Sequence, residues 1–196
     1  LADLAQLNPE SWAARTRPEE LDYVDLSNTK WGRIESIQHY QRDQAPSRAQ
    51  RVLRPGDTIV GTVRPGNGSY ALVCDEGLTG STGFAVLRPV FKPSREAVYL
   101  AATEPRNIER LAHLADGAAY PAVRPEIVVA TPSPVPTDAV LRAFSEFSRP
   151  LLDRIAAAER ESRTLAALRD SLLQKLISGE LRVPDPERFL ERAGVT

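Results

Sequence analysis

The sequence predicts an α+β fold, in which a globular region with a mostly antiparallel sheet is followed by one long α-helix. Over residues 1–136, short runs of β-forming residues alternate with Pro and Gly, and two helical segments follow most of them. After a proline-rich linker, the chain has no Gly from 137 to 178 and only one Pro, Pro150. Strand runs followed by helices are typical of α+β domains with antiparallel sheets.

The strands expected in the globular region are short. They are "YVDL" at 23–26, "RIESIQ" at 33–38, "DTIVGTVR" at 57–64, "SYALVC" at 69–74, "GFAVLR" at 83–88 and "EIVVAT" at 126–131. The third and fourth runs flank "PGNG", so we expect them to form a hairpin with a wide turn. Helices are expected at 94–102 and 107–116, and the Gly-rich piece "GLTGSTG" at 77–83 is expected to form turns.

The linker before the long helix contains Pro132, Pro134 and Pro136, which favour an extended backbone. Thr137 is positioned to cap the helix, and Gly179 to end it. Pro150 is expected either to kink this helix or to mark its true start. The predicted organisation is therefore a globular domain at 1–136, a long helix at 137–180 and a C-terminal tail at 181–196.

The long helix carries an apolar seam with alternating spacings of four and three residues. Its positions are Phe144, Ser148, Leu151, Ile155, Ala158, Ser162, Leu165, Arg169, Leu172 and Leu176. Seven of these ten positions are apolar, which is typical of a coiled coil. A helix of this length would span roughly 60 Å, more than its own domain can cover. We therefore favour a partner helix over packing against the same chain.

Composition excludes several classes of protein. The single cysteine, Cys74, rules out a disulfide framework and fits a reducing compartment, so a cytoplasmic location is expected. No apolar run approaches the roughly 18 residues of a membrane span. The net charge is −1, but residues 27–74 hold seven cationic and three acidic residues. Of the 25 cationic residues, 22 are arginines, which suits phosphate and guanine, although the codon bias of a GC-rich genome explains it equally well.

No catalytic or metal-binding pattern stands out. The Gly-rich segments lack the lysine of a phosphate-binding loop and the spacing of a dinucleotide fingerprint. His39, His113 and Cys74 are too far apart in sequence for a metal motif. The "NPES" at 8–11 begins like an adenine methyltransferase motif but lacks the aromatic residue that stacks on the base. A binding role is therefore favoured over an enzymatic one.

The order of several motifs resembles specificity subunits of type I restriction-modification systems. The most specific is "LAALRDSLLQKLISGELRV" at 165–183, which closes the long helix. The others, in order, are "LNPES" at 7–11, "YVDLSNTKWGRIES" at 23–36, "LRPGDTIVGTVRPGNGSYALV" at 53–73, "STGFAVLRP" at 81–89 and "SPVP" before the helix. Family members usually carry two recognition domains and two such helices, whereas this sequence has one of each. The chain thus resembles a half-subunit, or one half of a longer chain.

The resemblance implies a non-catalytic DNA-specificity module. Residues 1–136 would be a target recognition domain that reads one half of a bipartite site in double-stranded DNA. The helix would pair antiparallel with a second copy, and modification and restriction subunits would assemble on it. No cofactor is expected on this chain, because the modification subunit would bind S-adenosylmethionine. The alternative is a coiled-coil protein-interaction adaptor without DNA specificity.

Candidate site residues follow from these expectations. Eight loop residues combine side chains suited to bases or phosphates, namely Lys30, Trp31, Arg33, Arg64, Asn67, Ser69, Tyr70 and Thr82. For each of them the alternative is a solvated loop residue, whereas Trp12, Tyr23 and Phe84 are expected in the core. The resemblance divides the helix surface into two sets. The dimerisation set is Phe144, Leu151, Ile155, Leu165, Leu172 and Leu176, and the set for docking the modification subunit is Leu168, Leu173 and Ile177.

Overall fold

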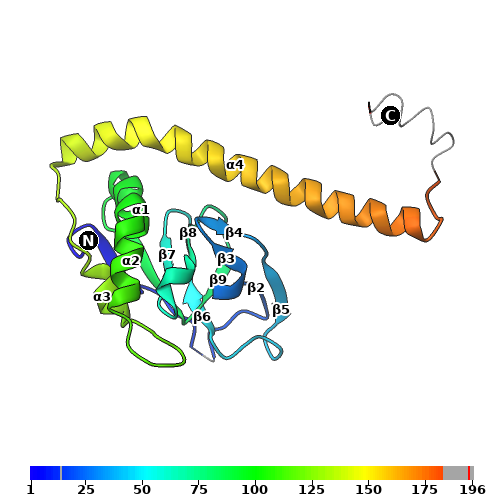
Figure 1. The fold of residues 1–196 in the computed structure, drawn as a ribbon, viewed down its shortest axis with the longest axis horizontal. Coiled ribbons are helices and arrows are strands. Elements are labelled where there is room, and N and C mark those ends of the chain that lie inside the picture. The colour runs from blue at the N-terminus through cyan, green and yellow to red at the C-terminus, as the bar shows by residue number, and fades with distance from the viewer. Residues whose placement is uncertain (14, 183–193, 195–196) are drawn as a thin grey trace. The chain divides into compact units, whose positions relative to one another are not determined.

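The computed structural model describes residues 1–13, 15–182 and 194, and it has the predicted α+β architecture (Figure 1). Within the described residues, the strands form two four-stranded sheets and a small two-stranded sheet. The α-helices of the same residues are α1 (Arg95–Thr103), α2 (Pro105–His113), α3 (Pro125–Val129) and the long α4 (Asp138–Ile177). By packing, the described residues form a compact unit, Leu1–Arg154, and a second unit from Ile155 onward.

The first sheet is fully antiparallel. Its strand order is β1 (Ala5–Leu7), β10 (Phe84–Pro89), β7 (Thr58–Gly61) and β8 (Tyr70–Leu72). The pairing of β7 with β8 confirms the predicted hairpin, with Val60 opposite Tyr70. A short 3-10 turn at Pro65–Asn67 makes the connection between them.

The second sheet has the order β5 (Gln38–Gln41), β2 (Glu20–Val24), β9 (Leu78–Ser81) and β6 (Ala49–Val52). Only the β2–β9 pair is parallel, so the sheets are mostly antiparallel as predicted. The third sheet is the hairpin of β3 (Thr29–Lys30) and β4 (Arg33–Ile34).

Three apolar clusters lie within the described residues of the compact unit, and β7 and β10 contribute to the two larger ones. Along β7, Val60 faces the cluster beneath α1–α3, whereas its neighbour Ile59 faces the cluster shared with Val24 and Leu53 of the second sheet region. Val86 and Leu87 on β10 alternate in the same way. Because successive strand residues point to opposite faces, β7 and the first four residues of β10 are buried on both sides.

Three expectations about the strands were wrong. The run 126–131 is mainly helical, because Pro125 starts α3 and Val128 buries its side chain against the face of the first sheet. The "GLTGSTG" segment contains the buried strand β9, where Gly80 leaves room for the side chain of Leu53. The run 33–38 is not one strand, since β4 ends at Ile34 and β5 begins at Gln38.

The long helix begins where the linker prolines predict. The amide of Leu141 donates to the carbonyl of Thr137, and helix α4 continues through Pro150, which is therefore not its start. The first turns of α4 belong to the compact unit and bury Leu141, Ser145 and Ser148. Most of the predicted tail at 181–196 lies outside the described residues. None of the helices in the described part of the chain is long and apolar enough to cross a membrane.

Candidate nucleic-acid interface

Two turns that are far apart in sequence meet at one surface of the compact unit. Lys30 pairs with Arg33, so Trp31 and Gly32 form the two-residue loop of the β3–β4 hairpin. The Trp31 amide donates to the Gly68 carbonyl at 2.6 Å, and the Gly32 amide donates to the Tyr70 carbonyl at 2.9 Å. These bonds fix the "KWGR" turn against the "RPGNG" turn of the β7–β8 hairpin.

A cleft of about 620 Å³ opens beside these turns. Five residues predicted from the sequence to contact DNA line it, namely Lys30, Arg64, Asn67, Ser69 and Thr82. The structure adds five polar or aromatic residues that the sequence did not single out, namely Asp25, Ser27, Arg48, Ser81 and Tyr120. Trp31, Arg33 and Tyr70 do not line the cleft, although all three lie in or next to the two turns.

Arg64 is held in place by the loop that precedes α3. Its backbone has a left-handed conformation, with φ 47°, and its amide donates to the Pro121 carbonyl at 2.7 Å. The guanidinium donates to the Ala119 carbonyl at 2.8 Å and lies 5.0 Å from the ring centroid of Tyr120. Arg64 is exposed, and these contacts orient its side chain. No sequence motif around Tyr120 indicates that its ring lies beside Arg64.

Arg48 is the cation that the sequence missed, although it lies in the basic stretch 27–74. Its guanidinium binds the Asp25 carboxylate at 2.8 Å and donates to the Tyr23 hydroxyl at 3.0 Å. Burial raises the pKa of Asp25, but hydrogen bonds from Tyr23 and Ser27 together with the charge of Arg48 outweigh it and lower the pKa. Asp25 thus remains ionised, and it holds the guanidinium of Arg48 in the lining of the cleft.

The other predicted residues differ in how available their side chains are. Ser69 is buried and its hydroxyl donates to the Leu26 carbonyl at 3.0 Å, so it closes the turn. Asn67 and Lys30 are exposed, whereas Tyr70 and Thr82 are half-buried. Burial raises the pKa of Tyr70. Asn67 and Lys30 are therefore better placed than Ser69 to reach a ligand.

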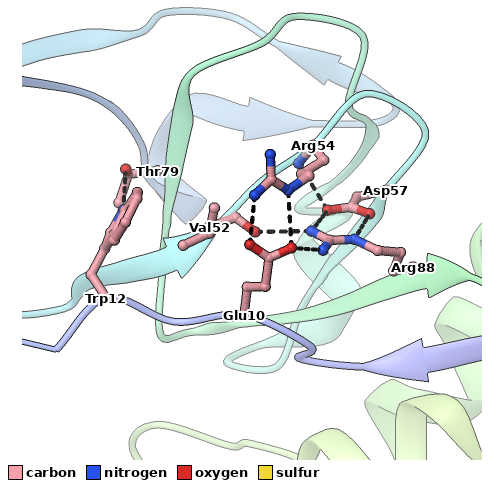
Figure 2. A network of polar contacts seen from close by, with 7 residues as sticks. All are labelled: Glu10, Trp12, Val52, Arg54, Asp57, Thr79 and Arg88. Atoms are coloured by element: carbon pink, nitrogen blue, oxygen red, sulfur yellow. Dashed lines mark hydrogen bonds and ion pairs between the residues drawn. The ribbon is translucent and has the colours of Figure 1, made fainter. Parts of the chain in front are cut away.

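Of the three expected core aromatics, two are buried. Tyr23 and Phe84 are almost fully enclosed. Trp12 is only half-buried, and its indole Nε1 donates at 3.0 Å to the hydroxyl of Thr79, which is itself buried (Figure 2).

The "NPES" segment has a structural role in the described residues. Glu10 binds Arg54 at 2.7 Å and also contacts Arg88, which in turn binds the buried carboxylate of Asp57 at 2.8 Å (Figure 2). Hydrogen bonds from Arg54 and Arg88 lower the pKa of Glu10 to about 2. Asn8 accepts a hydrogen bond from the Val86 amide through its side chain. Residues 8–11 are thereby bound to β10 and to the segment around Arg54.

Helix α4 exposes an apolar surface over its whole length. All nine residues of the two predicted sets are exposed, between 38% for Phe144 and 78% for Ile177. Leu165, Leu172 and Leu176 from one set and Leu168 and Leu173 from the other line one shallow groove. Ser148 is buried in its own compact unit, so the seam does not run through it. Phe147, which the 4-3 spacing omitted, is 74% exposed.

Among residues 1–13, 15–182 and 194, no group of three potential ligands could hold a metal ion. The candidate surface consists of cations, amides, hydroxyls and aromatic rings, together with the carboxylate of Asp25. Such side chains can bind phosphates, base edges and base faces.

Comparisons with solved structures find close counterparts of this fold. A chain described as the HsdS subunit from Thermoanaerobacter tengcongensis matches with a TM-score of 0.59 and 25% identity, covering 93% of this chain and 48% of that chain. A second match, from work on assembly and conformational transition of the type I R-M system, has a TM-score of 0.60 and 26% identity over the same shares. No protein-family model and no curated protein matches the sequence.

This chain spans about half the length of both structures that it matches. The match extends over nearly the whole of this chain's own length. The family predicted from the order of the motifs is thereby confirmed: the chain shares the structure of one half of a specificity subunit of type I restriction-modification systems.

Proposed function

We propose that this chain binds DNA in a sequence-specific manner and reads one half of a bipartite site for a type I restriction-modification system. The observation that carries the proposal is the cleft of the compact unit. Lys30 and Arg64, predicted independently from two distant turns, line it together with Asn67 and Arg48. Cations beside an amide match the two needs of DNA recognition, which are phosphate neutralisation and contact with base edges.

The geometry suggests different roles for these side chains. Arg64 suits the paired acceptors of guanine, and Asn67 suits adenine. Arg48 and Lys30 are placed for phosphates, since Arg48 already shares its charge with Asp25. To reach a base, Arg64 has to exchange the Ala119 carbonyl and the Tyr120 ring for DNA. DNA binding would thus release the loop that precedes α3.

Helix α4 would pair antiparallel with α4 of a second copy. An antiparallel pair centred on residue 160 would bring Phe144 opposite Leu176 and Ile155 opposite Leu165. Every one of these four side chains is exposed in the single chain. A contiguous apolar surface of this kind is typical of a protein–protein contact, and 4-3 spacing is typical of a coiled coil.

The same helix would serve the other subunits. Leu168, Leu173 and Ile177 are exposed beside the seam, which leaves them for the modification subunit once the seam is paired. The restriction subunit would join that assembly. S-adenosylmethionine would be bound by the modification subunit, and this chain would contribute specificity without catalysis. Purified chain incubated with S-adenosylmethionine and DNA should therefore transfer no methyl groups, and detection of transfer would refute this part of the proposal.

The experiment begins by mapping methylated sites in the cell of origin to identify the recognised sequence. Binding of the chain to that duplex and to a scrambled duplex is then measured by fluorescence anisotropy at several salt concentrations. We expect preference for the mapped duplex and a log–log decrease of affinity with salt. Equal or absent binding to both duplexes, alone and with the modification subunit, would instead support the adaptor without DNA specificity.

Arg64→Ala tests the cleft itself, with Arg106→Ala on α2 as a control outside it. If Arg64 contacts a base, the variant should lose about 1–3 kcal/mol on the mapped duplex and discriminate less at one position. If it contacts phosphate, both duplexes should weaken alike and the salt slope should fall by about one unit. Arg64→Ala binding that equals wild type on both duplexes would exclude Arg64 from the interface.

A further inference from the structure

We infer that Trp31 is an aromatic wedge, whose indole inserts at a base step of the bound DNA so that the chain also reads how easily that step opens. The inference rests on the proposed DNA binding and adds a second kind of readout to it. Contacts to base edges do not require an exposed indole. DNA binding can therefore be confirmed while the insertion of Trp31 is disproved.

Trp31 is 61% exposed, although the sequence has only one other tryptophan and that one is half-buried. It lies between Lys30 and Arg33 at the tip of a hairpin that borders the cleft. A large apolar ring flanked by cations on a solvated turn is poorly suited to an apolar partner. It fits a partner that offers flat aromatic faces and a surrounding negative charge.

The backbone at Trp31 is strained. Trp31 has φ 49° and Gly32 has φ 90°, which together form the kind of two-residue hairpin turn that prefers Asn-Gly. A bulky residue with positive φ is disfavoured by its own Cβ, and such strain is retained where the surrounding structure enforces it. Here the enforcing contacts are the hydrogen bonds from Trp31 and Gly32 to the β7–β8 hairpin.

The indole is also held in a fixed orientation. A Cβ atom at Gly68 would lie 2.6 Å from Cδ2 of Trp31, so the ring lies directly on the backbone of that glycine. The ring of Tyr70 meets the indole edge-to-face, with centroids 6.0 Å apart. One side of the indole is thus supported by protein, and the rest of its surface is presented to solvent in a preorganised position.

A simpler role for Trp31 is to pin the two turns together. The supported side of the ring already performs that function, and asparagine, which this turn position prefers, would occupy it with less positive-φ strain. The large exposed part remains to be explained. Apolar side chains inserted from a positively charged surface unstack base steps and bend DNA. The cost of opening is lowest at pyrimidine–purine steps, so such a wedge contributes specificity without contacts to base edges.

The test uses Trp31→Asn in the full chain. Asparagine is favoured at this turn position, so the variant should unfold at the same or a higher urea concentration than wild type. Its affinity for the mapped duplex should nevertheless fall about tenfold or more, because aromatic stacking on a base is lost. Trp31→Phe should retain most of the affinity. Val90→Asn, which removes a 54% exposed apolar side chain elsewhere on the compact unit, should bind like wild type.

Two optical signals separate a wedge from a pin. In a Trp12→Phe background Trp31 is the only tryptophan, and its emission should be quenched when anisotropy reports DNA binding. With 2-aminopurine placed at successive steps of the duplex, wild type should raise its fluorescence at one step, and Trp31→Asn should not. Specific binding without either signal would overturn the wedge and leave the proposed function intact. A Trp31→Asn variant that loses stability and affinity together, with no 2-aminopurine change in wild type, would make Trp31 a pin. Failure of the wild-type chain to bind any duplex would disprove both the wedge and the proposed DNA-binding function.

Discussion

The guanidinium of Arg149 on α4 donates from Nε to the carboxylate of Glu96 on α1, with 3.1 Å between Nε and Oε1. Glu96 is completely buried, and its other oxygen has no hydrogen-bond partner. Arg149 also donates to the Ser145 hydroxyl at 2.8 Å, and Arg95 on α1 binds Asp153 at 2.7 Å. Two ion pairs one helical turn apart therefore fasten the start of α4 to the compact unit.

Arg149→Leu should destabilise the chain strongly, because it leaves the buried carboxylate of Glu96 with only the longer contact to Arg95, at 3.6 Å, among the described ion pairs. Removing one partner of a buried pair costs about 3–5 kcal/mol, and the partial exposure of Arg149 puts the expected loss at the lower end. The free energy of unfolding in urea measures it. Arg154→Leu, an exposed arginine on the same helix, is the control. The double variant Glu96→Leu with Arg149→Leu should recover much of the lost stability. If Arg149→Leu alone lowers the free energy of unfolding by no more than about 0.5 kcal/mol, the ion pair contributes no more than an ordinary surface contact.

Glu10 predicts how stability depends on acid pH. Its pKa in the folded chain is about 2, against an ordinary value of 4.5, because Arg54 and Arg88 bind the ionised form. The contribution to stability is therefore fully present above about pH 4.5 and is lost as the pH falls toward 2. Glu10→Gln should lower stability at neutral pH and flatten its decrease between pH 4.5 and 2. Urea titrations at several pH values compare it with Glu76→Gln, an exposed control. Parallel pH profiles for Glu10→Gln and wild type would show that the network does not depend on this ionisation.

The fold could be predicted where one local pattern decides the structure. The hairpin 57–64 and 69–74 follows from two β-forming runs around "PGNG", and α4 follows from a long stretch without glycine. The failures occur where packing overrides composition. Three consecutive apolar residues, Ile127 to Val129, read as a strand, but Pro125 starts a helix that covers a sheet face. Gly80 reads as part of a turn, but its missing side chain makes room for Leu53 inside the second sheet.

The candidate site was predictable in part for the same reason. Lys30, Arg64 and Asn67 lie in short turns with strong sequence signatures, so their exposure could be foreseen. Arg48 and Tyr120 could not, because their places depend on contacts between segments distant in sequence, with Asp25 in one case and Arg64 in the other. The apolar seam of α4 was predicted from residue spacing alone. Spacing does not show which side chains are buried in the compact unit, such as Ser148, and which are exposed, such as Phe147.

Leu165→Asp combined with Leu172→Asp should convert a dimer into monomers. Both leucines are exposed on the single chain, and an antiparallel pair would bury them, so added charges would be desolvated. Light scattering at micromolar concentration gives the mass. Ser171→Asp with Gln174→Asp adds the same charge at exposed positions outside the seam and should leave the dimer intact. A wild-type chain that stays monomeric, both alone and with the modification subunit, would contradict the antiparallel pair.

The length of α4 should set the spacing between the two half-sites. With identical recognition domains at opposite ends of an antiparallel pair, the recognised site should be a palindrome interrupted by a nonspecific spacer. Seven residues inserted between Ile155 and Ser162 keep the heptad seam in register. They lengthen the helix by about 10 Å, or about three base pairs at 3.4 Å each. Those pairs also rotate one half-site by about a third of a turn, which a rigid pair of helices resists.

A second insertion separates the effect of length from that of rotation. Three heptads at the same position add about 32 Å, or about nine base pairs, which is close to a full turn of the duplex. We expect the half-sites to remain unchanged in both variants, with the longer insertion restoring more activity than the shorter one. Methylated sites mapped in cells that carry each variant beside wild type provide the measurement. An active variant that keeps the original spacer would show that α4 does not determine the spacing, because a rigid pair that grew by one or three heptads could no longer place two recognition domains on the old half-sites.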